Sequence, residues 1–245
     1  MNIKNIIKNY PKKRNPLSRE INKIFKREYK KNRTNFLSQL SESWLHFSIK
    51  GRNSNQKCST LEVGAGTLNH LKYECNNNLY DYSIIEPKKF LFKKNILKKK
   101  IKNIYKNYLK LPYKHFDRII SCAVLEHLDD LPMFLVKSSF SMKKNGYQSH
   151  SIPCEGYPTW KFSWDLISGL PFKLRTGLNF NEIQKFEHVN NFDEIVDLIK
   201  FFYNNVSIKF SYPFFLSPYT SLYANITFSS PKKRVIAKYL NEKKN

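Results

Sequence analysis

The chain has 245 residues, of which 41% are hydrophobic and 15% aromatic. This composition excludes a disordered chain, and the length suits one domain with additional segments. The formal net charge of +24 points to a nucleic acid, an anionic membrane or an acidic substrate as partner. A skewed base composition explains the charge equally well, because lysine, asparagine and isoleucine are frequent throughout and only 7 residues are glycine.

The four cysteines, at positions 58, 75, 122 and 154, form no Cys-x-x-Cys pair and show no spacing typical of a metal site. We therefore predict reduced thiols, no metal and a cytoplasmic protein. No apolar run reaches the roughly 18 residues of a membrane-spanning helix. The basic N-terminus also lacks the apolar core of a signal peptide. Contact of the basic surface with an anionic membrane remains open.

The first 55 residues are expected to form a basic arm followed by helices. Pro11 and Pro16 interrupt residues 1–16, so this arm is either poorly ordered or docked. Apolar residues recur at helical spacing over residues 17–31 and 35–49. These two helices either form a lid beside a ligand cleft or cover a sheet edge. A polar linker at residues 51–57 follows.

Strand and helix patterns then alternate, which predicts a parallel, doubly wound α/β sheet. The expected strands are residues 58–63, 82–85, 101–105, 116–121 and 147–152. The expected helices begin at residue 68, at residue 88 and at residue 131, and cover residues 68–73, 88–97 and 131–142. Ligands of such sheets bind at the carboxyl ends of the strands.

A glycine turn follows the first expected strand. Gly64 and Gly66 allow a tight turn and close approach of a ligand to the backbone. Glu86 ends the next strand, where a carboxylate can bind ribose hydroxyls. Asn69 stands where a dinucleotide fingerprint needs a third glycine. Glu62 at the mouth of the loop would repel a pyrophosphate but suits the ammonium and sulfonium groups of S-adenosylmethionine.

The remainder of the chain carries a different pattern. Residues 154–190 are aromatic and irregular, which predicts a functional insertion rather than disorder. A helix is expected at residues 192–203, followed by an antiparallel pair of strands at residues 206–212 and 222–228 at the sheet edge. The basic tail at residues 231–245 is expected to fray.

Three stretches resemble motifs of the class I S-adenosylmethionine-dependent methyltransferases. Leu61-Glu62-Val63-Gly64-Ala65-Gly66-Thr67 resembles the first motif, Ile85-Glu86-Pro87 the second, and residues 116–128 the fourth-strand motif. The resemblance implies a Rossmann-like, seven-stranded methyltransferase sheet over residues 56–230. It implies S-adenosylmethionine as the cofactor, bound by Glu62, Gly64, Ala65, Gly66, Leu68, Glu86, Pro87, Asn107, Ser121 and Leu125. Asn107 replaces the acid that the family often places near the adenine amino group.

The flanking segments resemble a narrower group of bacterial members linked to surface-polysaccharide biosynthesis. The matching stretches are Glu42-Ser43-Trp44-Leu45-His46, Ile152-Pro153-Cys154-Glu155-Gly156 and Phe186-Glu187-His188-Val189-Asn190. This resemblance implies a small-molecule acceptor, namely a hydroxyl of a sugar or glycan precursor. Trp160 and Trp164 would then stack on the substrate, with Glu187 beside it, although core packing is an equally ordinary role for a tryptophan.

Methyl transfer to a hydroxyl needs a base as well as positioning. His127, just past the fourth strand, is either this base or a residue of the cleft wall. Glu126 beside it would cap a backbone group or orient the base. His188 and His150 are either alternative bases on the substrate side or structural residues. The sequence offers no chemical argument for His46, His70 and His115. Two other functions stay open, an RNA methyltransferase that uses the basic surface and a non-catalytic binding protein.

Overall fold

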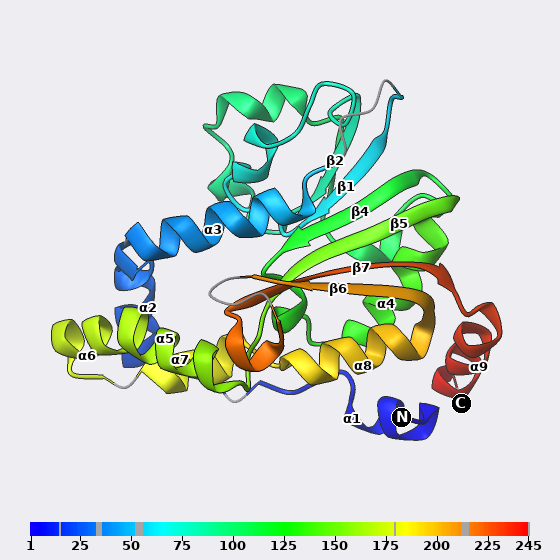
Figure 1. Ribbon diagram of the computed structural model, residues 1–245. Coiled ribbons are helices and arrows are strands. Elements are labelled where there is room, and N and C mark those ends of the chain that lie inside the picture. Colours follow the sequence, from blue (N-terminus) through cyan, green and yellow to red (C-terminus); the bar gives the residue numbers. More distant parts are fainter. Residues whose placement is uncertain (15, 33–35, 52–55, 179, 212–215, 245) are drawn as a thin grey trace.

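The computed structural model describes residues 1–245 except 15, 33–35, 52–55, 179, 212–215 and 245, so most of the predicted linker lies outside the described residues. A seven-stranded sheet in the order β3-β2-β1-β4-β5-β7-β6 forms the centre (Figure 1). Its strands are β1 Ser59–Val63, β2 Asp81–Ile85, β3 Asn103–Tyr105, β4 Phe116–Cys122, β5 Met142–Pro153, β6 Tyr203–Phe210 and β7 Tyr223–Pro231. The predicted sheet is confirmed.

The five strands from β1 to β5 pair in parallel, whereas β7 pairs antiparallel with both β5 and β6. Every residue of β1 and β2 is buried, as expected for strands covered on both faces. The carboxyl ends of β1, β2 and β4 therefore lie at one edge of the sheet. The predicted hairpin is confirmed, with β7 inserted between β5 and the edge strand β6.

Helices cover both faces of the sheet (Figure 1). On one face lie α4 (Leu131–Ser141) and α8 (Phe192–Phe202), which pack against each other. A capping box starts α8, because the Asn191 side chain accepts from the backbone of Glu194 and the Glu194 carboxylate accepts from the backbone of Asn191. On the other face α3 (Phe36–Ile49) crosses β4, β5 and β7.

The N-terminal arm is docked rather than poorly ordered. It contains α1 (Ile3–Asn9), whose Ile3 and Ile6 are buried in the main core. After α1, the Tyr10 hydroxyl donates to Asn190, 3.0 Å away, and the Lys12 ammonium binds Glu194 at 2.6 Å. The helix α2 (Arg19–Asn32) follows, so both predicted N-terminal helices are present.

The segment at residues 154–190, predicted as irregular, is instead almost continuously helical. It consists of α5 (Pro158–Trp164), a π-helical turn η6 (Asp165–Gly169), α6 (Leu170–Thr176) and α7 (Phe180–Glu187). The prediction was wrong because closely spaced aromatic residues hide the helical period. Phe172, Phe180 and Ile183 form a separate small core, against which Leu17, Ile21 and Ile24 of the N-terminal region pack.

Two predicted helices of the α/β region are only short 3-10 turns. Residues 68–73 form η1 (Asn69–Lys72), and residues 88–97 form η2 (Lys89–Leu91) and part of η3 (Ile96–Lys100). Other 3-10 turns are η4 (Tyr108–Lys110), η5 (Leu125–His127) and η7 (Pro218–Thr220). Leu68 has a left-handed backbone at the start of the first segment, and in the second the Asn95 side chain accepts from the backbone N–H of Leu97, so neither segment continues as an α-helix.

The basic tail does not fray. Its residues form α9 (Lys233–Lys244), which buries Ile236 and Tyr239 and lies beside α1 (Figure 1). The Lys243 ammonium binds Asp130, 2.7 Å away, and Asp130 also caps α4. The prediction of fraying followed from the charge of the tail and overlooked its apolar stripe.

Candidate functional site

The glycine turn lies at the carboxyl end of β1. Both glycines have left-handed backbones, with φ of +70° at Gly64 and +51° at Gly66. A Cβ atom on Gly64 would lie 2.5 Å from Val124, so Gly64 is required by close packing. A Cβ atom on Gly66 would meet nothing closer than the Gly64 carbonyl oxygen at 4.0 Å. The space beside Gly66 is therefore open to a ligand.

Glu86 stands at the end of β2 and holds this turn in place. Its Oε2 accepts from the backbone N–H of Gly66 at 2.9 Å, and its Oε1 accepts from the N–H of Lys88 at 2.8 Å. The side chain is almost completely buried. The parallel pairing of β1 and β2 places Val63 opposite Ile85, so the glycine turn and the carboxylate are adjacent. A nucleoside site needs this arrangement, in which a glycine turn lies next to a carboxylate that can bind ribose hydroxyls.

Glu62 lies inside the sheet rather than at an open mouth. Only 3% of it is exposed, and its Oε2 accepts from the Tyr82 hydroxyl at 2.9 Å. Burial raises the pKa of Glu62 to about 8, so the acid is largely neutral at pH 7. The expectation that Glu62 presents a charged carboxylate is corrected. A positively charged ligand group nearby would favour ionisation again.

The other predicted cofactor residues have four kinds of surroundings. Ala65 and Pro87 flank the glycine turn and Glu86, whereas Leu68 and Leu125 are fully buried packing residues. The Asn107 side chain is exposed, and its oxygen accepts from the backbone of Leu109 at 3.0 Å, which caps η4. The Ser121 hydroxyl points into the core, 2.7 Å from His150 Nδ1, so only its backbone remains for ligand contact.

Acidic and imidazole side chains gather beyond the end of β4. Ligand atoms of Glu126, His127 and His188 lie within 4.8 Å of one another. His127 Nδ1 donates to the backbone oxygen of Glu187 at 2.7 Å, and His188 Nδ1 lies 2.5 Å from Glu155 Oε2. The structure therefore brings Glu126 and His127 together with Glu187 and His188, two pairs that lie about a quarter of the chain apart in the sequence.

The groups in this cluster have different protonation states. Burial raises the pKa of Glu126 to about 7, because its carboxylate is 1% exposed and its Oε2 has no partner among the described residues. Burial and the neighbouring His188 lower the pKa of His127. Burial opposes ionisation of His188 as well, but the hydrogen bond that His188 donates to the Glu155 carboxylate outweighs it and raises the His188 pKa. Glu126 is thus better matched than His127 to accept a proton near neutral pH.

The two tryptophans are packing residues in this structure. Trp160 is 4% exposed and stacks on Trp164 with ring centroids 5.1 Å apart. Trp164 also stacks on Phe180 at 5.4 Å, and its indole nitrogen has no hydrogen-bond partner in the described part of the chain. Both rings also contact His188. Trp160 is thus a core residue beside the imidazole cluster, whereas Trp164 is partly exposed and its stacking on a substrate stays a prediction.

Arg14 is a site residue that the sequence reasoning missed. Its guanidinium donates to the backbone oxygens of Phe186 and His127 and binds the Asp129 carboxylate at 2.7 Å. The arm therefore ties η5 to the end of α7. Its only sequence signal was a lone arginine between prolines in a lysine-rich segment. The alternative candidate His150 is fully buried between Ser121 and Phe228, away from the cluster.

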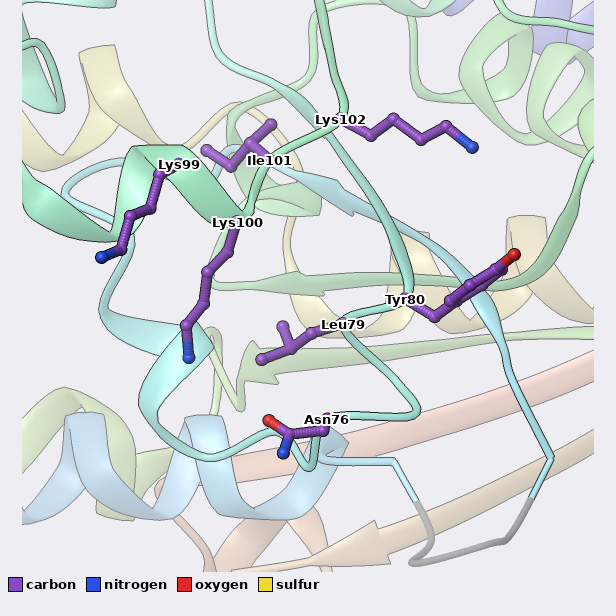
Figure 2. A pocket seen from close by; sticks show the side chains of 7 residues that line it. All are labelled: Asn76, Leu79, Tyr80, Lys99, Lys100, Ile101 and Lys102. Atoms are coloured by element: carbon purple, nitrogen blue, oxygen red, sulfur yellow. The ribbon is translucent and has the colours of Figure 1, made fainter.

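A lysine-lined cavity of about 470 Å³ lies at the opposite edge of the sheet. Figure 2 shows Asn76, Leu79 and Tyr80 before β2, and Lys99 to Lys102 before β3. The ammonium groups of Lys99 and Lys102 point away from each other in this view (Figure 2). The cavity belongs to the amino edge of the strands and does not lead to the glycine turn.

No protein-family model and no curated protein sequence matches the chain. Solved structures match its fold. A Thermotoga maritima protein, a SAM-dependent methyltransferase and possible histamine N-methyltransferase, aligns with a TM-score of 0.54 and 16% identity over 84% of this chain and 97% of the other. A SAM-dependent methyltransferase from Archaeoglobus fulgidus aligns with a TM-score of 0.50 and 14% identity over 80% and 92% of the two chains.

A third match is the Haemonchus contortus phosphoethanolamine N-methyltransferase 2. It aligns with a TM-score of 0.51 and 9% identity, over 74% of this chain and 51% of that protein. At such low identities the likeness establishes the fold, which is that of class I S-adenosylmethionine-dependent methyltransferases. Among the described residues no helix is both long and apolar enough to cross a membrane.

Proposed function

We propose that this chain is an enzyme that transfers a methyl group from S-adenosylmethionine to a small-molecule acceptor, a hydroxyl of a sugar or glycan precursor. One observation carries the proposal. The glycine turn after β1, bound to a buried acid at the end of β2, shares a sheet edge with the Glu126 cluster after β4. A cofactor site and a proton-accepting site are thus neighbours in a methyltransferase fold.

The residues of the first site fit a nucleoside with a charged side chain. Gly66 leaves open space, and Glu86 offers carboxylate oxygens at the position where ribose hydroxyls bind in related folds. Buried Glu62 supplies a group that ionises when a cation is near. S-adenosylmethionine supplies, when bound, an electrophilic methyl group on sulfur. The protein needs only to position the acceptor and remove its proton.

The second site favours an acceptor that must lose a proton. Glu126, with its raised pKa, can accept the proton of a hydroxyl. Burial keeps His127 neutral, and its Nδ1 proton is directed to the Glu187 carbonyl. Two of the stretches that resemble surface-polysaccharide methyltransferases also meet here, since Glu155 binds His188. The third stretch lies against β5, where the Leu45 carbonyl accepts from the Ser151 hydroxyl at 2.9 Å. This convergence supports a glycan-precursor acceptor.

Calorimetry with S-adenosylmethionine and S-adenosylhomocysteine tests the cofactor. We expect micromolar binding, weakened about 10- to 100-fold in Glu86→Ala, because the loss of hydrogen bonds to a charged group costs about 1.5–3 kcal/mol. The exposed Glu182→Ala on α7 is the matched control and should bind as the unchanged protein does. Folded protein that binds neither compound contradicts the proposal. Binding would be followed by a screen of nucleotide sugars for methyl transfer.

A further inference from the structure

A second cluster of potential metal ligands lies outside the residues used above. His46 comes from α3, His70 from η1 and Cys122 from the last position of β4. One nitrogen of each histidine and the Cys122 sulfur lie within 4.8 Å of one another. The His46 Nδ1 and the Cys122 sulfur are 3.1 Å apart. Both imidazoles are buried, and Cys122 is partly buried.

His70 is held as metal-binding histidines usually are. Its Nε2 lies 2.6 Å from Glu74, and the Arg118 guanidinium binds both oxygens of that carboxylate at 2.9 and 2.7 Å. The ionised carboxylate fixes the proton on Nε2 and leaves the lone pair on Nδ1. Metal-bound histidines commonly have such a carboxylate behind the ring.

The Nδ1 of His70 is the unexplained atom. His70 is 0% exposed, yet this nitrogen has no hydrogen-bond partner among the described residues. Burying an unsatisfied polar atom costs about 1–3 kcal/mol, so such atoms are rare without a role. A cation bound between His70, His46 and Cys122 would satisfy it.

His46 has the same arrangement on the other side of the cluster. Its Nε2 lies 3.6 Å from Glu42, which also accepts from Asn69 at 2.8 Å, while its Nδ1 faces Cys122. Each imidazole of the cluster thus has a carboxylate behind it, Glu42 behind His46 and Glu74 behind His70.

We propose that His46, His70 and Cys122 bind a Zn²⁺ ion that fastens α3 to the carboxyl edge of the sheet. Two imidazoles and one thiolate are ligands that zinc prefers, and a water molecule would complete four-coordination. Binding replaces the thiol proton of Cys122, which passes to solvent, while each imidazole binds through Nδ1 and keeps its Nε2 proton. The ligands are distant in sequence, so their spacing did not indicate a metal and the prediction of none is revised.

Cobalt titration of the chelator-treated, full-length protein tests this site. We expect one equivalent of Co²⁺ to produce a thiolate-to-cobalt charge-transfer band together with intense visible bands of a four-coordinate ion, and Zn²⁺ to displace it. Cys122→Ser should abolish the charge-transfer band. His46→Ala should weaken binding by more than the roughly 10- to 100-fold typical for loss of an outer partner.

Cys75→Ser and His115→Ala are the matched controls, because both residues lie outside the cluster, and they should bind Co²⁺ as the unchanged protein does. If Cys122→Ser fails to fold, His46→Ala carries the test. Zn²⁺ should also slow amide exchange at the end of α3 in the unchanged protein and not in His46→Ala. Absence of the charge-transfer band in the unchanged protein overturns the proposal, as does equal Co²⁺ affinity of His46→Ala.

Discussion

At the residue scale, the environment of Glu126 is one that its neighbours in the sequence do not predict. It follows a hydrophobic strand end, next to a histidine that is the more conventional base. The structure buries Glu126 almost completely, and the backbone N–H groups of Val189 and Asn190 bind its carbonyl oxygen at 2.8 and 3.1 Å. The same contacts that fix its backbone deprive its carboxylate of solvent, and this burial raises its pKa to about 7.

The role of Glu126 as the proton acceptor predicts a pH dependence of methyl transfer. A base works only when deprotonated, so the rate should rise with pH through about 7 and then level off. Glu126→Gln should lower kcat by about 10²- to 10⁴-fold, abolish this rise and leave the affinity for S-adenosylmethionine unchanged. Steady-state kinetics from pH 5.5 to 9, a range of roughly two units on either side of the group's pKa, measures both effects.

His127→Asn is the comparison variant, because an asparagine amide can still donate to the Glu187 carbonyl. If His127 were the base, its lowered pKa would keep it deprotonated over this range, so the rate would not rise through pH 7 and His127→Asn, rather than Glu126→Gln, would lower kcat. That reversal would assign the proton transfer to the histidine, whose pKa is lowered by burial.

Single residues were predictable from sequence where the signal is local. Gly64, Gly66 and Glu86 follow apolar strands at a regular spacing, and the structure places them together. The charge state of Glu62 was not predictable, because it depends on how completely the folded sheet buries the side chain. The Glu155–His188 pair and the contacts of Arg14 join segments far apart in the chain, and nothing in one sequence specifies such pairing.

At the element scale, the sheet was predictable and most helices of the insertion were not. Buried parallel strands are continuous apolar runs, so each can be recognised alone. The helices α5, α6 and α7 pack their aromatic residues against the N-terminal region. The spacing of these aromatic residues can be explained only when that packing partner is known. The tail illustrates the same point, since α9 is stabilised by its packing against α1 and α8.

The packing of α9 predicts a large loss of stability on truncation of Tyr239. This residue is 0% exposed, and its ring contacts Phe202 of α8 with centroids 5.4 Å apart. Tyr239→Ala should lower the free energy of unfolding by about 3–5 kcal/mol, as for other large buried aromatic side chains. Lys238→Ala on the exposed side of α9 should change it by less than about 0.5 kcal/mol. Urea denaturation of both variants measures the difference, and equal midpoints would mean that α9 frays.

At the scale of the whole molecule, the lysine-lined cavity lies away from the chemistry. The lysine-lined cavity is at the amino edge of β2 and β3, whereas the glycine turn and Glu126 are at the carboxyl edge. The residues nearest the chemistry include the buried or half-buried acids Glu62, Glu86, Glu126 and Glu187. The lysine-lined cavity therefore does not present RNA to the site.

The distribution of charge predicts how the protein should respond to RNA. Binding of an unstructured single-stranded RNA should be purely electrostatic, so that its logarithmic affinity falls linearly with the logarithm of salt concentration. Replacing Lys99, Lys100 and Lys102 together with glutamine should reduce that slope by at most about 2, since each phosphate contact contributes about 0.7. Because the cavity lies at the far edge of the sheet, the same variant should bind S-adenosylmethionine unchanged, and RNA should not alter that affinity.

Fluorescence anisotropy at several salt concentrations, with and without S-adenosylhomocysteine, measures both the salt dependence of RNA binding and its coupling to the cofactor. Salt-resistant RNA binding that strengthens with the cofactor would instead favour the RNA methyltransferase, because only an acceptor bound beside the cofactor couples to it.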